Sequence, residues 1–184
     1  MVYILLADGF ETIEALAPAD ILRRAEIPAA LAAVSGEAAV SSHGIAVKAD
    51  MSLDGVRPAD LAEGDMIMLP GGGEGVKNLA GTPAVAELIR AANGCGAFLA
   101  AICAAPSILA DMGLLKGRSA VSHPSVKDAL IKGGAVYVED ARVVTDGRII
   151  TAKAAGNSID FGLTLAEVLK TAQTAQNIKS DIFY

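Results

Sequence analysis

The sequence predicts an α/β protein in which helices cover a mostly parallel sheet. Short β-branched or leucine-rich runs alternate with alanine-rich stretches, which is the pattern of parallel strands joined by crossover helices. The apolar runs have the length of strands and are broken by Gly, Asp or Pro. With 184 residues, 53% of them hydrophobic, the chain can bury a sizeable core, and we expect a single domain over residues 1–184.

The first half of the chain supplies the first strands of this sheet. The predicted elements are, in order, a strand over 2–7, a helix over 11–25, a strand over 29–35, a hairpin or edge strand over 40–48, and a strand over 66–70. Arg23 and Arg24 fall in the last turn of the first helix, where cations suit the helix dipole. A Ser-His-Gly break interrupts the hairpin segment, and a triglycine follows the strand that ends at Pro70.

The second half continues the alternation. The predicted elements are a helix over 83–93, a strand ending at Cys103, a helix over 104–112, a strand over 120–122, a short helix over 125–131, two or three strands within 136–151, and a helix over 157–176. The turn Asp146-Gly147 separates the late strands. The closing segment is amphipathic over its whole length, which predicts one long helix.

Charge and composition restrict the function. The formal net charge is -6, from 15 basic and 21 acidic residues, and no basic run exceeds the pair Arg23-Arg24, which argues against nucleic acid as the main partner. No basic leader and no apolar run of membrane length is present, so we expect neither a signal peptide nor a membrane span. Two cysteines and two distant histidines provide neither a disulfide framework nor a metal site, and a reducing cytoplasm is the expected location.

Cys103 is the candidate reaction centre. It ends an apolar strand and is followed at once by a helical stretch, so it should stand at a nucleophile elbow on the carboxyl edge of the sheet. Nearby amides of the next helix favour an anion, and thiolate is the reactive form of cysteine. The alternative is a small buried residue at a strand end. The small residues Ala-Ala-Pro after Cys103 favour function, whereas Cys95, between two glycines, has no activating neighbour.

The triglycine after Pro70 should lie at the same edge of the sheet. It matches neither a phosphate-binding loop nor a dinucleotide-binding fingerprint, so no nucleotide cofactor is expected. Backbone N–H groups of Gly71 and Gly72, together with that of Ala104, are candidates for an oxyanion hole, because glycine lets amides turn toward developing negative charge. A tight turn required only for packing explains the glycines equally well.

Glu14 and His123 are the candidate proton carriers. Glu14 follows the first strand, in the loop Asp8-Gly9-Phe10-Glu11-Thr12-Ile13-Glu14, and is a surface residue by default. If it faces Cys103 instead, burial and the anionic sulfur favour its neutral form, which can donate a hydrogen bond to the thiolate. His123 begins His-Pro directly after a strand, where an imidazole can carry protons for a thiol or serve a structural role. His43 carries no clear signal.

Several segments together resemble the ThiJ/PfpI superfamily, in the branch of the parkinsonism-associated protein deglycase, DJ-one, and its bacterial relatives. The segments, in chain order, are ADGFETIEALAPADILRRA, MLPGGGEG, AAICAAP, SHPSVKD and AGNSIDFGL. The resemblance implies a flavodoxin-like α/β sandwich, a homodimer and no metal or organic cofactor. It also implies that Cys103 is the reactive cysteine, Glu14 its protonated partner and His123 the histidine.

The resemblance assigns further residues to the site and to the dimer. Amides of Gly72 and Ala104 match oxyanion donors, Asp20 matches an acidic dimer contact that approaches the histidine, and Arg24 matches an interface arginine. The chain also departs from the family pattern at two places. His43 stands where many members have arginine, which makes any anion contact there dependent on pH, and Ala154-Ala155-Gly156 replaces Gly-Pro-Gly. We therefore expect a pocket of different shape.

The activity implied by the resemblance is that of a glutathione-independent glyoxalase or deglycase. Such an enzyme converts methylglyoxal or glyoxal to a 2-hydroxy acid, with a role in carbonyl and oxidative stress. The alternative is a non-enzymatic redox sensor or chaperone that acts through oxidation of Cys103. A cysteine peptidase or amidotransferase is less favoured, because Ala104 rather than histidine follows Cys103 and His123-Pro124-Ser125 lacks the His-x-Glu pattern. The expected partners are a small aldehyde and a second copy of the chain.

Overall fold

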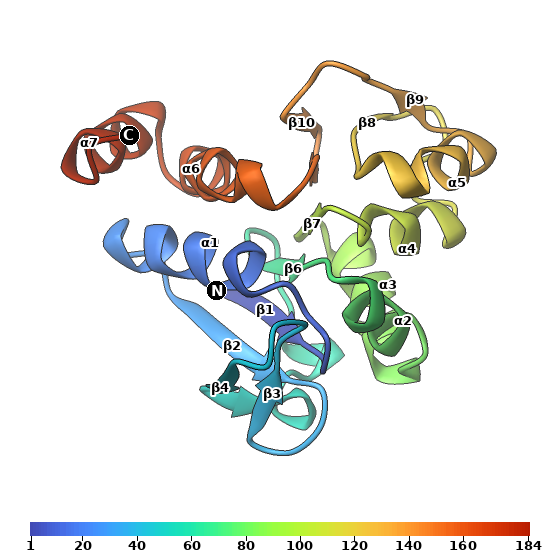
Figure 1. Ribbon diagram of the computed structural model, residues 1–184, viewed down its shortest axis with the longest axis horizontal. Coiled ribbons are helices and arrows are strands. Elements are labelled where there is room, and N and C mark those ends of the chain that lie inside the picture. The colour runs from blue at the N-terminus through green and yellow to red at the C-terminus, as the bar shows by residue number, and fades with distance from the viewer.

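A seven-stranded sheet forms the centre of the molecule in the computed structural model, which describes residues 1–184 (Figure 1). The strand order is β10-β11-β7-β6-β1-β2-β5, and all neighbours are parallel except β10 and β11. The strands are β1 (Val2–Leu6), β2 (Ala29–Ala33), β5 (Met51–Ser52), β6 (Met66–Leu69), β7 (Phe98–Ile102), β10 (Val143–Asp146) and β11 (Ile149–Ala152). The predicted α/β class with a mostly parallel sheet is confirmed.

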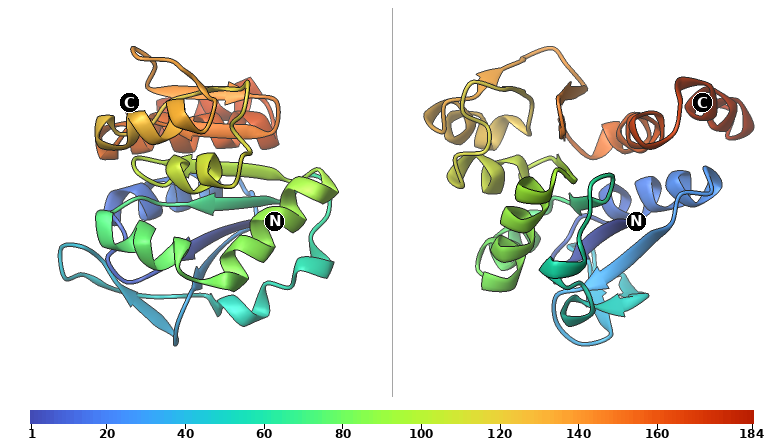
Figure 2. Two further views of the ribbon diagram at one scale, coloured as in Figure 1. Left: turned by 90° about the vertical axis from the view of Figure 1, so that its right-hand side faces the viewer. Right: turned by 180° about the vertical axis from the view of Figure 1, so that it is seen from behind.

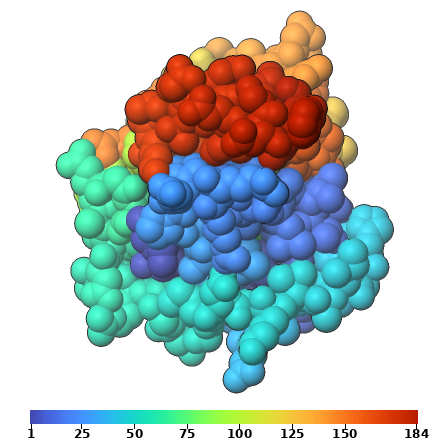
Figure 3. Space-filling model, turned by 90° about the vertical axis from the view of Figure 1, so that its left-hand side faces the viewer, coloured from blue at the N-terminus to red at the C-terminus, as the bar shows by residue number.

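Helices cover both faces of the sheet (Figure 2). One face carries α1 (Thr12–Arg24) and α6 (Ser158–Leu169), with α7 (Ala172–Asp181) packed on α6. Figure 3 shows the C-terminal segment beside α1 on this side of the molecule. The opposite layer consists of α2 (Gly73–Ala80), α3 (Pro83–Cys95), α4 (Pro106–Asp111) and α5 (Lys127–Lys132), and α5 packs on α4.

Short elements complete the fold. A separate hairpin pairs β3 (Ala38–Val40) with β4 (Ala46–Lys48), and a small parallel pair joins β8 (Ser119–Ala120) to β9 (Val136–Tyr137). Four 3-10 turns lie over Leu53–Gly55, Pro58–Asp60, Pro124–Val126 and Ala155–Asn157. The hairpin prediction for residues 40–48 is therefore confirmed, whereas the strand predicted at 120–122 lies outside the central sheet.

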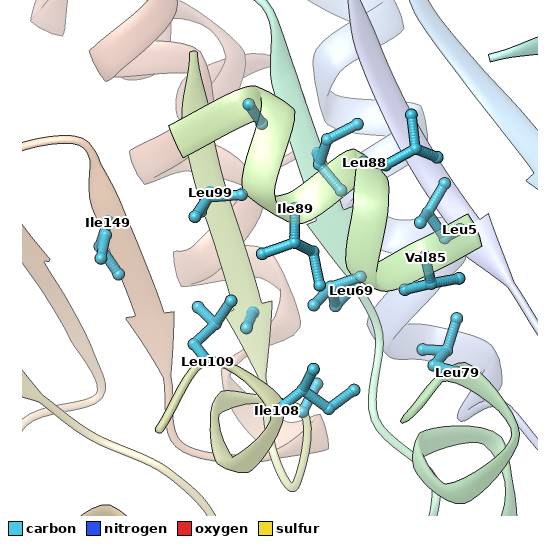
Figure 4. Close-up of a cluster of buried hydrophobic side chains, with 14 of the residues drawn as sticks. Leu5, Leu69, Leu79, Val85, Leu88, Ile89, Leu99, Ile108, Leu109 and Ile149 are labelled. Atoms are coloured by element: carbon cyan, nitrogen blue, oxygen red, sulfur yellow. The ribbon is translucent and has the colours of Figure 1, made fainter. Parts of the chain in front are cut away.

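Two apolar cores explain why the strands are apolar at every position. Alternate residues of a strand point to opposite faces, and here both faces are covered by helices. In β1, Ile4 and Leu6 pack in the core under α1 and α6, while Leu5 packs in the core under α3. Figure 4 shows Leu88 and Ile89 of α3 against the side chains of the sheet. This packing fixes the register of the strands whose ends carry the site.

The predicted helix over 157–176 is wrong in one respect, because the structure has two helices there. The first, α6, ends at Leu169, and Lys170 leaves the helical conformation with φ -128° and ψ -96°. Thr171 then starts α7, and its Oγ1 accepts a hydrogen bond from the N–H of Thr174 at 3.1 Å. No glycine or proline marks this break. The only local signal for it is the capping threonine.

Two boundaries near the triglycine and Cys103 also differ from the predictions. The triglycine continues into an unpredicted helix, α2, which begins at Gly73. The helix predicted from residue 104 begins at Pro106, after a turn formed by residues 103–105. No helix of this chain combines the length and the apolar character that crossing a bilayer would require.

Candidate active site

Three loops meet at the carboxyl edge of the sheet. Because β1, β6 and β7 are adjacent and parallel, the segments that follow them leave from the same edge. These segments carry Glu14 in the first turn of α1, Gly71 and Gly72 after β6, and Cys103 after β7. The chain reverses its direction of travel across the sheet between β1 and β6, and such a reversal opens a crevice for ligands.

Cys103 has a backbone conformation that is rare for a residue with a side chain. Its φ is 63°, in the left-handed region, which costs about 1–2 kcal/mol for a non-glycine residue. Two hydrogen bonds hold it there, because its N–H donates to the carbonyl of Ala152 at 3.0 Å and its carbonyl accepts from the N–H of His123 at 2.8 Å. This is the geometry of a nucleophile elbow. It also ties His123 to Cys103 through the backbone.

Glu14 is fully buried, contrary to the default expectation for a glutamate. Its Oε2 accepts a hydrogen bond from the N–H of Gly71 at 2.8 Å, and Oε1 has no hydrogen-bond partner. The Cys103 thiol lies beside the carboxyl group. Burial raises the pKa of Glu14 to about 7, in spite of the hydrogen bonds to Cys103 and Gly71, which lower it. Near neutral pH this carboxyl can therefore give or take a proton.

Gly71 leaves the space in which Glu14 and Cys103 meet. A Cβ at Gly71 would lie 2.5 Å from Oε2 of Glu14 and 2.6 Å from Cβ of Cys103, so no other residue fits without moving one of them. The sequence analysis proposed the Gly71 amide as an oxyanion donor. Because this N–H is bonded to Glu14, it is not free for a substrate oxygen.

The Cys103 thiol is not activated by its position alone. Burial and the negative charge of Glu14 raise its pKa to about 12, although the amides of Ala104 and Gly72 lower it. The nearby amides therefore lower the pKa of Cys103 as expected, but burial and the charge of Glu14 raise it by more. Protonation of Glu14 removes this repulsion, so the thiolate is less disfavoured when Glu14 is neutral. The two groups act as a pair that shares one proton near neutral pH.

The amides of Gly72 and Ala104 remain available as donors. Neither N–H donates to a backbone carbonyl, and both act on the Cys103 sulfur. The left-handed φ of Gly72, 93°, belongs to the turn that leads into α2. These two amides are placed where an oxygen on a carbon bonded to sulfur would accumulate negative charge.

His123 is oriented by Ser125, a residue that the sequence analysis did not select. Nδ1 of His123 accepts a hydrogen bond from the N–H of Ser125 at 3.2 Å and lies 2.8 Å from Oγ of the same serine. Because Nδ1 accepts, the neutral ring carries its proton on Nε2. The sequence signal for Ser125 is its place at a helix start two residues after His123. At such a start, the side chain of the capping residue can accept a hydrogen bond from a backbone N–H of the first turn.

A pocket of about 370 Å³ joins these groups. Its walls come from the three loops, from the segment after β8 and from the segment before α6. They are formed by Glu11, Glu14, Gly72, Gly73, Cys103, Ala104, His123, Ser125, Ala154, Ala155 and Gly156. The structure thus brings together the predicted Cys103, Glu14 and His123. Glu11, the extended residue that precedes α1, was missed as a site residue, although it belongs to the same loop after β1 as Glu14.

The other predicted residues lie outside this pocket. Asp20 and Arg24 pair with each other on the exposed side of α1, with Nε of Arg24 2.7 Å from Oδ2 of Asp20. Cys95 is exposed at the end of α3, and its thiol contacts the carbonyl of Ala92 at 3.5 Å. His43 lies on the β3–β4 hairpin, next to Glu11. A larger hollow, of about 460 Å³ between α6 and α7, has no cysteine or histidine in its walls.

No group of three or more His, Cys, Asp or Glu side chains is arranged to hold a metal ion. The groups at the pocket are a thiol, two carboxyls, an imidazole and two free amides. Such a set can add sulfur to a carbonyl carbon, hold the resulting oxyanion and move protons.

Comparison with known proteins gives a consistent result over nearly the whole chain. A family model described as the DJ-1/PfpI family matches residues 1–168. A Caenorhabditis elegans protein named as a glutathione-independent glyoxalase is 31% identical over 168 residues, which cover 91% of this chain and 87% of that protein. A Pyrococcus abyssi protein named as a deglycase is 31% identical over 169 residues, with coverage of 92% and 99%.

Among solved structures, a mutant of a DJ-1 superfamily protein from Salmonella typhimurium superposes with a TM-score of 0.90. It is 36% identical, and the match covers 100% of this chain and 97% of that chain. This similarity confirms the flavodoxin-like arrangement of sheet and helices.

Proposed function

This chain belongs to the DJ-1/PfpI family, as its motifs predicted, and we propose that it is a glutathione-independent glyoxalase. The proposed substrates are methylglyoxal and glyoxal, and the products are lactate and glycolate. The observation that carries the proposal is the contact of Cys103 with a fully buried Glu14 whose pKa lies near 7. A nucleophile and a carboxyl that exchanges protons at neutral pH are what an aldehyde-to-acid isomerisation requires.

The first proposed step is addition of sulfur to the aldehyde. The Cys103 thiolate forms a bond to C1 of the substrate while the C1–oxygen double bond opens and its electron pair moves to oxygen. The N–H groups of Gly72 and Ala104 stabilise this oxyanion, and the neutral Glu14 supplies the proton that converts it to a hydroxyl. The product is a hemithioacetal, and Glu14 is left as a carboxylate.

The second step moves hydrogen from C1 to C2. The Glu14 carboxylate removes the proton from C1, and the negative charge passes to the oxygen on C2 as an enediolate. Return of a proton to C2, from Glu14 or from Nε2 of His123, together with transfer of the C1 hydroxyl proton to the oxygen on C2, gives a 2-hydroxy thioester. C1 is oxidised and C2 is reduced by the same two electrons. Water then cleaves the thioester, releases the hydroxy acid and restores the thiol, so no external oxidant or cofactor takes part.

The relatives support the same class of chemistry. One is named as a glyoxalase and another as a deglycase, and both align over most of this chain. Free-aldehyde removal and repair of early glycation adducts begin with the same carbonyl carbon, so a deglycase-type activity is part of the proposal. A cytoplasmic enzyme for carbonyl and oxidative stress would need the reduced thiol that this mechanism uses.

Steady-state production of lactate from methylglyoxal tests the proposal. The wild-type protein should release lactate without added glutathione, metal or nucleotide, and a Cys95→Ser variant should match it. Absence of lactate release by the folded protein, with Cys103 reduced, would refute the proposed activity.

A redox sensor is the second candidate, because the same geometry favours an oxidised sulfur. Cys103 is half-buried, and a neutral Glu14 can donate a hydrogen bond to a sulfinate oxygen while the free amides of Gly72 and Ala104 bind another. This reading is preferred if the wild type shows no turnover but forms a stable Cys103 sulfinate at low peroxide. Mass mapping of the oxidised protein distinguishes the two candidates.

We also propose that the protein is a homodimer through α1 and the β3–β4 hairpin. Three large apolar side chains, Ile13, Val40 and Ile45, are 45–50% exposed on these two elements. Asp20 and Arg24 lie on the same helix and would border such an interface. Light scattering at micromolar concentration should give the mass of two chains. A mass of one chain would leave Asp20 without a role across subunits.

A further inference from the structure

The pocket contains acidic side chains but no lysine or arginine. Glu11 and Glu14 both line it, and His123 is the only other side chain in its walls that can carry a charge apart from the Cys103 thiolate. Glu11 is about 20% exposed at the pocket edge, whereas Glu14 is fully buried. The negative charge of Glu11 raises the pKa of Glu14, so it acts at the centre of the site. An incoming anion would therefore meet a carboxylate of the same sign.

The β3–β4 hairpin holds Glu11 in this position. Oγ of Ser42 donates a hydrogen bond to Oε2 of Glu11 at 3.1 Å, and Nδ1 of His43 lies 3.1 Å from the same Oγ and 3.7 Å from Oε2. Because the single hydroxyl proton of Ser42 is directed at Glu11, Nδ1 of His43 is the donor in its contact with Ser42. His43 is thus the basic partner of the Glu11 carboxylate.

The hairpin is itself fixed to the loop that carries Glu11. Ser42 N–H donates to the carbonyl of Phe10 at 2.8 Å, and Val40 N–H donates to Oδ1 of Asp8 at 2.8 Å. Asp8 and Glu11 are the acidic side chains that contact this hairpin from the loop after β1, and Glu11 forms no ion pair with any lysine or arginine of the chain. The charge at this edge is set by two carboxylates and one imidazole.

We propose that Glu11 makes the pocket select uncharged carbonyl compounds over anionic ones, and that His43 adjusts this selection with pH. The proposal rests on the glyoxalase function proposed above and names its substrate class as neutral 2-oxoaldehydes, with carboxylated or phosphorylated carbonyl compounds excluded. Repulsion by the partly exposed Glu11 carboxylate should disfavour an anion in the pocket by roughly 3- to 10-fold. A positively charged imidazole 3.7 Å from Oε2 of Glu11 would offset the carboxylate, so the selection should weaken when His43 carries a proton on both ring nitrogens.

Alkylation of Cys103 by a neutral and an anionic reagent measures this selection without any turnover. Second-order rate constants for alkylation by iodoacetamide and by iodoacetate are determined from pH 5.5 to 8 in a Cys95→Ser background. The iodoacetamide-to-iodoacetate ratio of the protein is then divided by the same ratio for N-acetylcysteine, and the quotient is the normalised preference. Both reagents attack the same thiolate, so the ratio cancels the fraction of thiolate at each pH. We expect a normalised preference of roughly 3- to 10-fold for iodoacetamide at pH 8, smaller at pH 5.5 and in high salt.

Variants separate the groups involved. Glu11→Gln should lower the preference at every pH, and His43→Gln should retain more of it at pH 5.5 than the wild type does. The charge that Glu14 gains near pH 7 is common to all of these proteins. Glu37→Gln, which removes a carboxylate from the start of the same hairpin without a place in the pocket walls, is the matched control and should behave as wild type. His123→Asn should leave the change between pH 5.5 and 8 in place, because His123 is not the partner of Glu11.

Three results would overturn the proposal. These are a normalised ratio near one in the wild type, a ratio that Glu11→Gln leaves unchanged, and a pH dependence that His43→Gln leaves unchanged. Lactate release is measured on the same samples. Failure of lactate release with the preference intact refutes the glyoxalase function alone, whereas turnover without the preference refutes the selection alone.

A competition experiment connects the selection to substrates. Glyoxylate is an anionic aldehyde that can add sulfur but has no second carbonyl carbon to accept the hydrogen. It should inhibit methylglyoxal turnover weakly in the wild type and roughly 3- to 10-fold more strongly in Glu11→Gln. Equal inhibition of the two proteins by glyoxylate contradicts the proposal.

Discussion

The two cysteines of this chain lie at opposite ends of the same strand, β7, and their surroundings differ completely. Cys95 ends α3 before the strand, is exposed, and contacts the carbonyl of Ala92 at the negative end of its helix. Cys103 follows the strand, has a left-handed backbone, and lies against a buried carboxyl and two free amides. The residue type is the same, so the fold supplies the difference.

The comparison indicates that the two cysteines are distinguished by a neighbouring buried acid and not by the exposure of the thiol. Exposure alone would make Cys95 the more accessible thiol, and burial raises the pKa of Cys103. What Cys103 has and Cys95 lacks is a neighbouring carboxyl, that of Glu14, whose pKa of about 7 lets it exchange a proton near neutral pH. The parallel sheet makes this possible, because it brings the segments after β1, β6 and β7 to one edge.

The largest expected effect comes from exchanging the nucleophile. Cys103→Ser should lower methylglyoxal turnover by more than about 10³-fold, because a hydroxyl adds poorly to the aldehyde and is a poor leaving group from the resulting ester. Cys95→Ser, the matched change at the other end of β7, should leave kcat and KM within about twofold. Steady-state lactate assays on both variants make the measurement. Comparable losses in the two would show that the ends of β7 do not differ in function.

Removing only the exchangeable proton tests the role of Glu14. Glu14→Gln keeps the size and a hydrogen-bond donor but cannot shuttle a proton, so turnover should fall by about 10²-fold or more while Cys103 still reacts with iodoacetamide. Glu14→Asp keeps the acid but retracts it by one methylene, and should retain more activity than the glutamine variant. Near-normal turnover in Glu14→Gln would show that Glu14 is not the base, and His123 would then be the first candidate.

The buried acid should also cost stability, and only at the Cys103 end of β7. The pKa of Glu14 in the folded protein, about 7, lies above the ordinary 4.5. Its contribution to the free energy of unfolding is therefore fully present below pH 4.5 and is lost as pH rises through 7. The loss is roughly 3 kcal/mol. Denaturant unfolding at pH 4.5 and 8 should therefore show Glu14→Gln more stable than wild type at pH 8 and similar at pH 4.5. A Glu14→Gln variant that keeps the wild-type pH slope would contradict this account.

Much of this arrangement could be predicted from the sequence, because it depends on strand order. Apolar runs mark β1, β6 and β7, and the carboxyl ends of parallel strands meet, so the sequence predicts Cys103 and Glu14 at one edge. His123 follows β8, which lies outside the central sheet, so its place beside them does not follow from strand order. Partners set by single hydrogen bonds could not be predicted in this way. The Gly71 amide serves Glu14 rather than substrate, and Ser125 orients His123, and neither follows from periodicity.

Glu11 and the break at Lys170 show the same limit. The i, i+3 spacing of Glu11 and Glu14 was visible in the sequence, but the contact of Glu11 with Ser42 depends on how a distant hairpin docks on the loop after β1. The end of α6 depends on one capping threonine within a continuous amphipathic pattern. Residue patterns set the elements and their order, whereas side-chain pairing across elements required the structure.

The smallest expected effect concerns Ser125, which orients His123 at the Cys103 end of β7. Ser125→Ala removes the hydroxyl 2.8 Å from Nδ1 but keeps the N–H donor at 3.2 Å, so the imidazole loses one of two contacts. We expect kcat to fall by about 2- to 10-fold with KM nearly unchanged, because the ring would be less well placed to return a proton to C2. Ser180→Ala on α7, whose hydroxyl bonds to the carbonyl of Gln176, is the control for loss of a hydroxyl and should not change kcat. If Ser125→Ala changes KM instead of kcat, Ser125 contacts the substrate directly, and the proton at C2 comes from Glu14 alone.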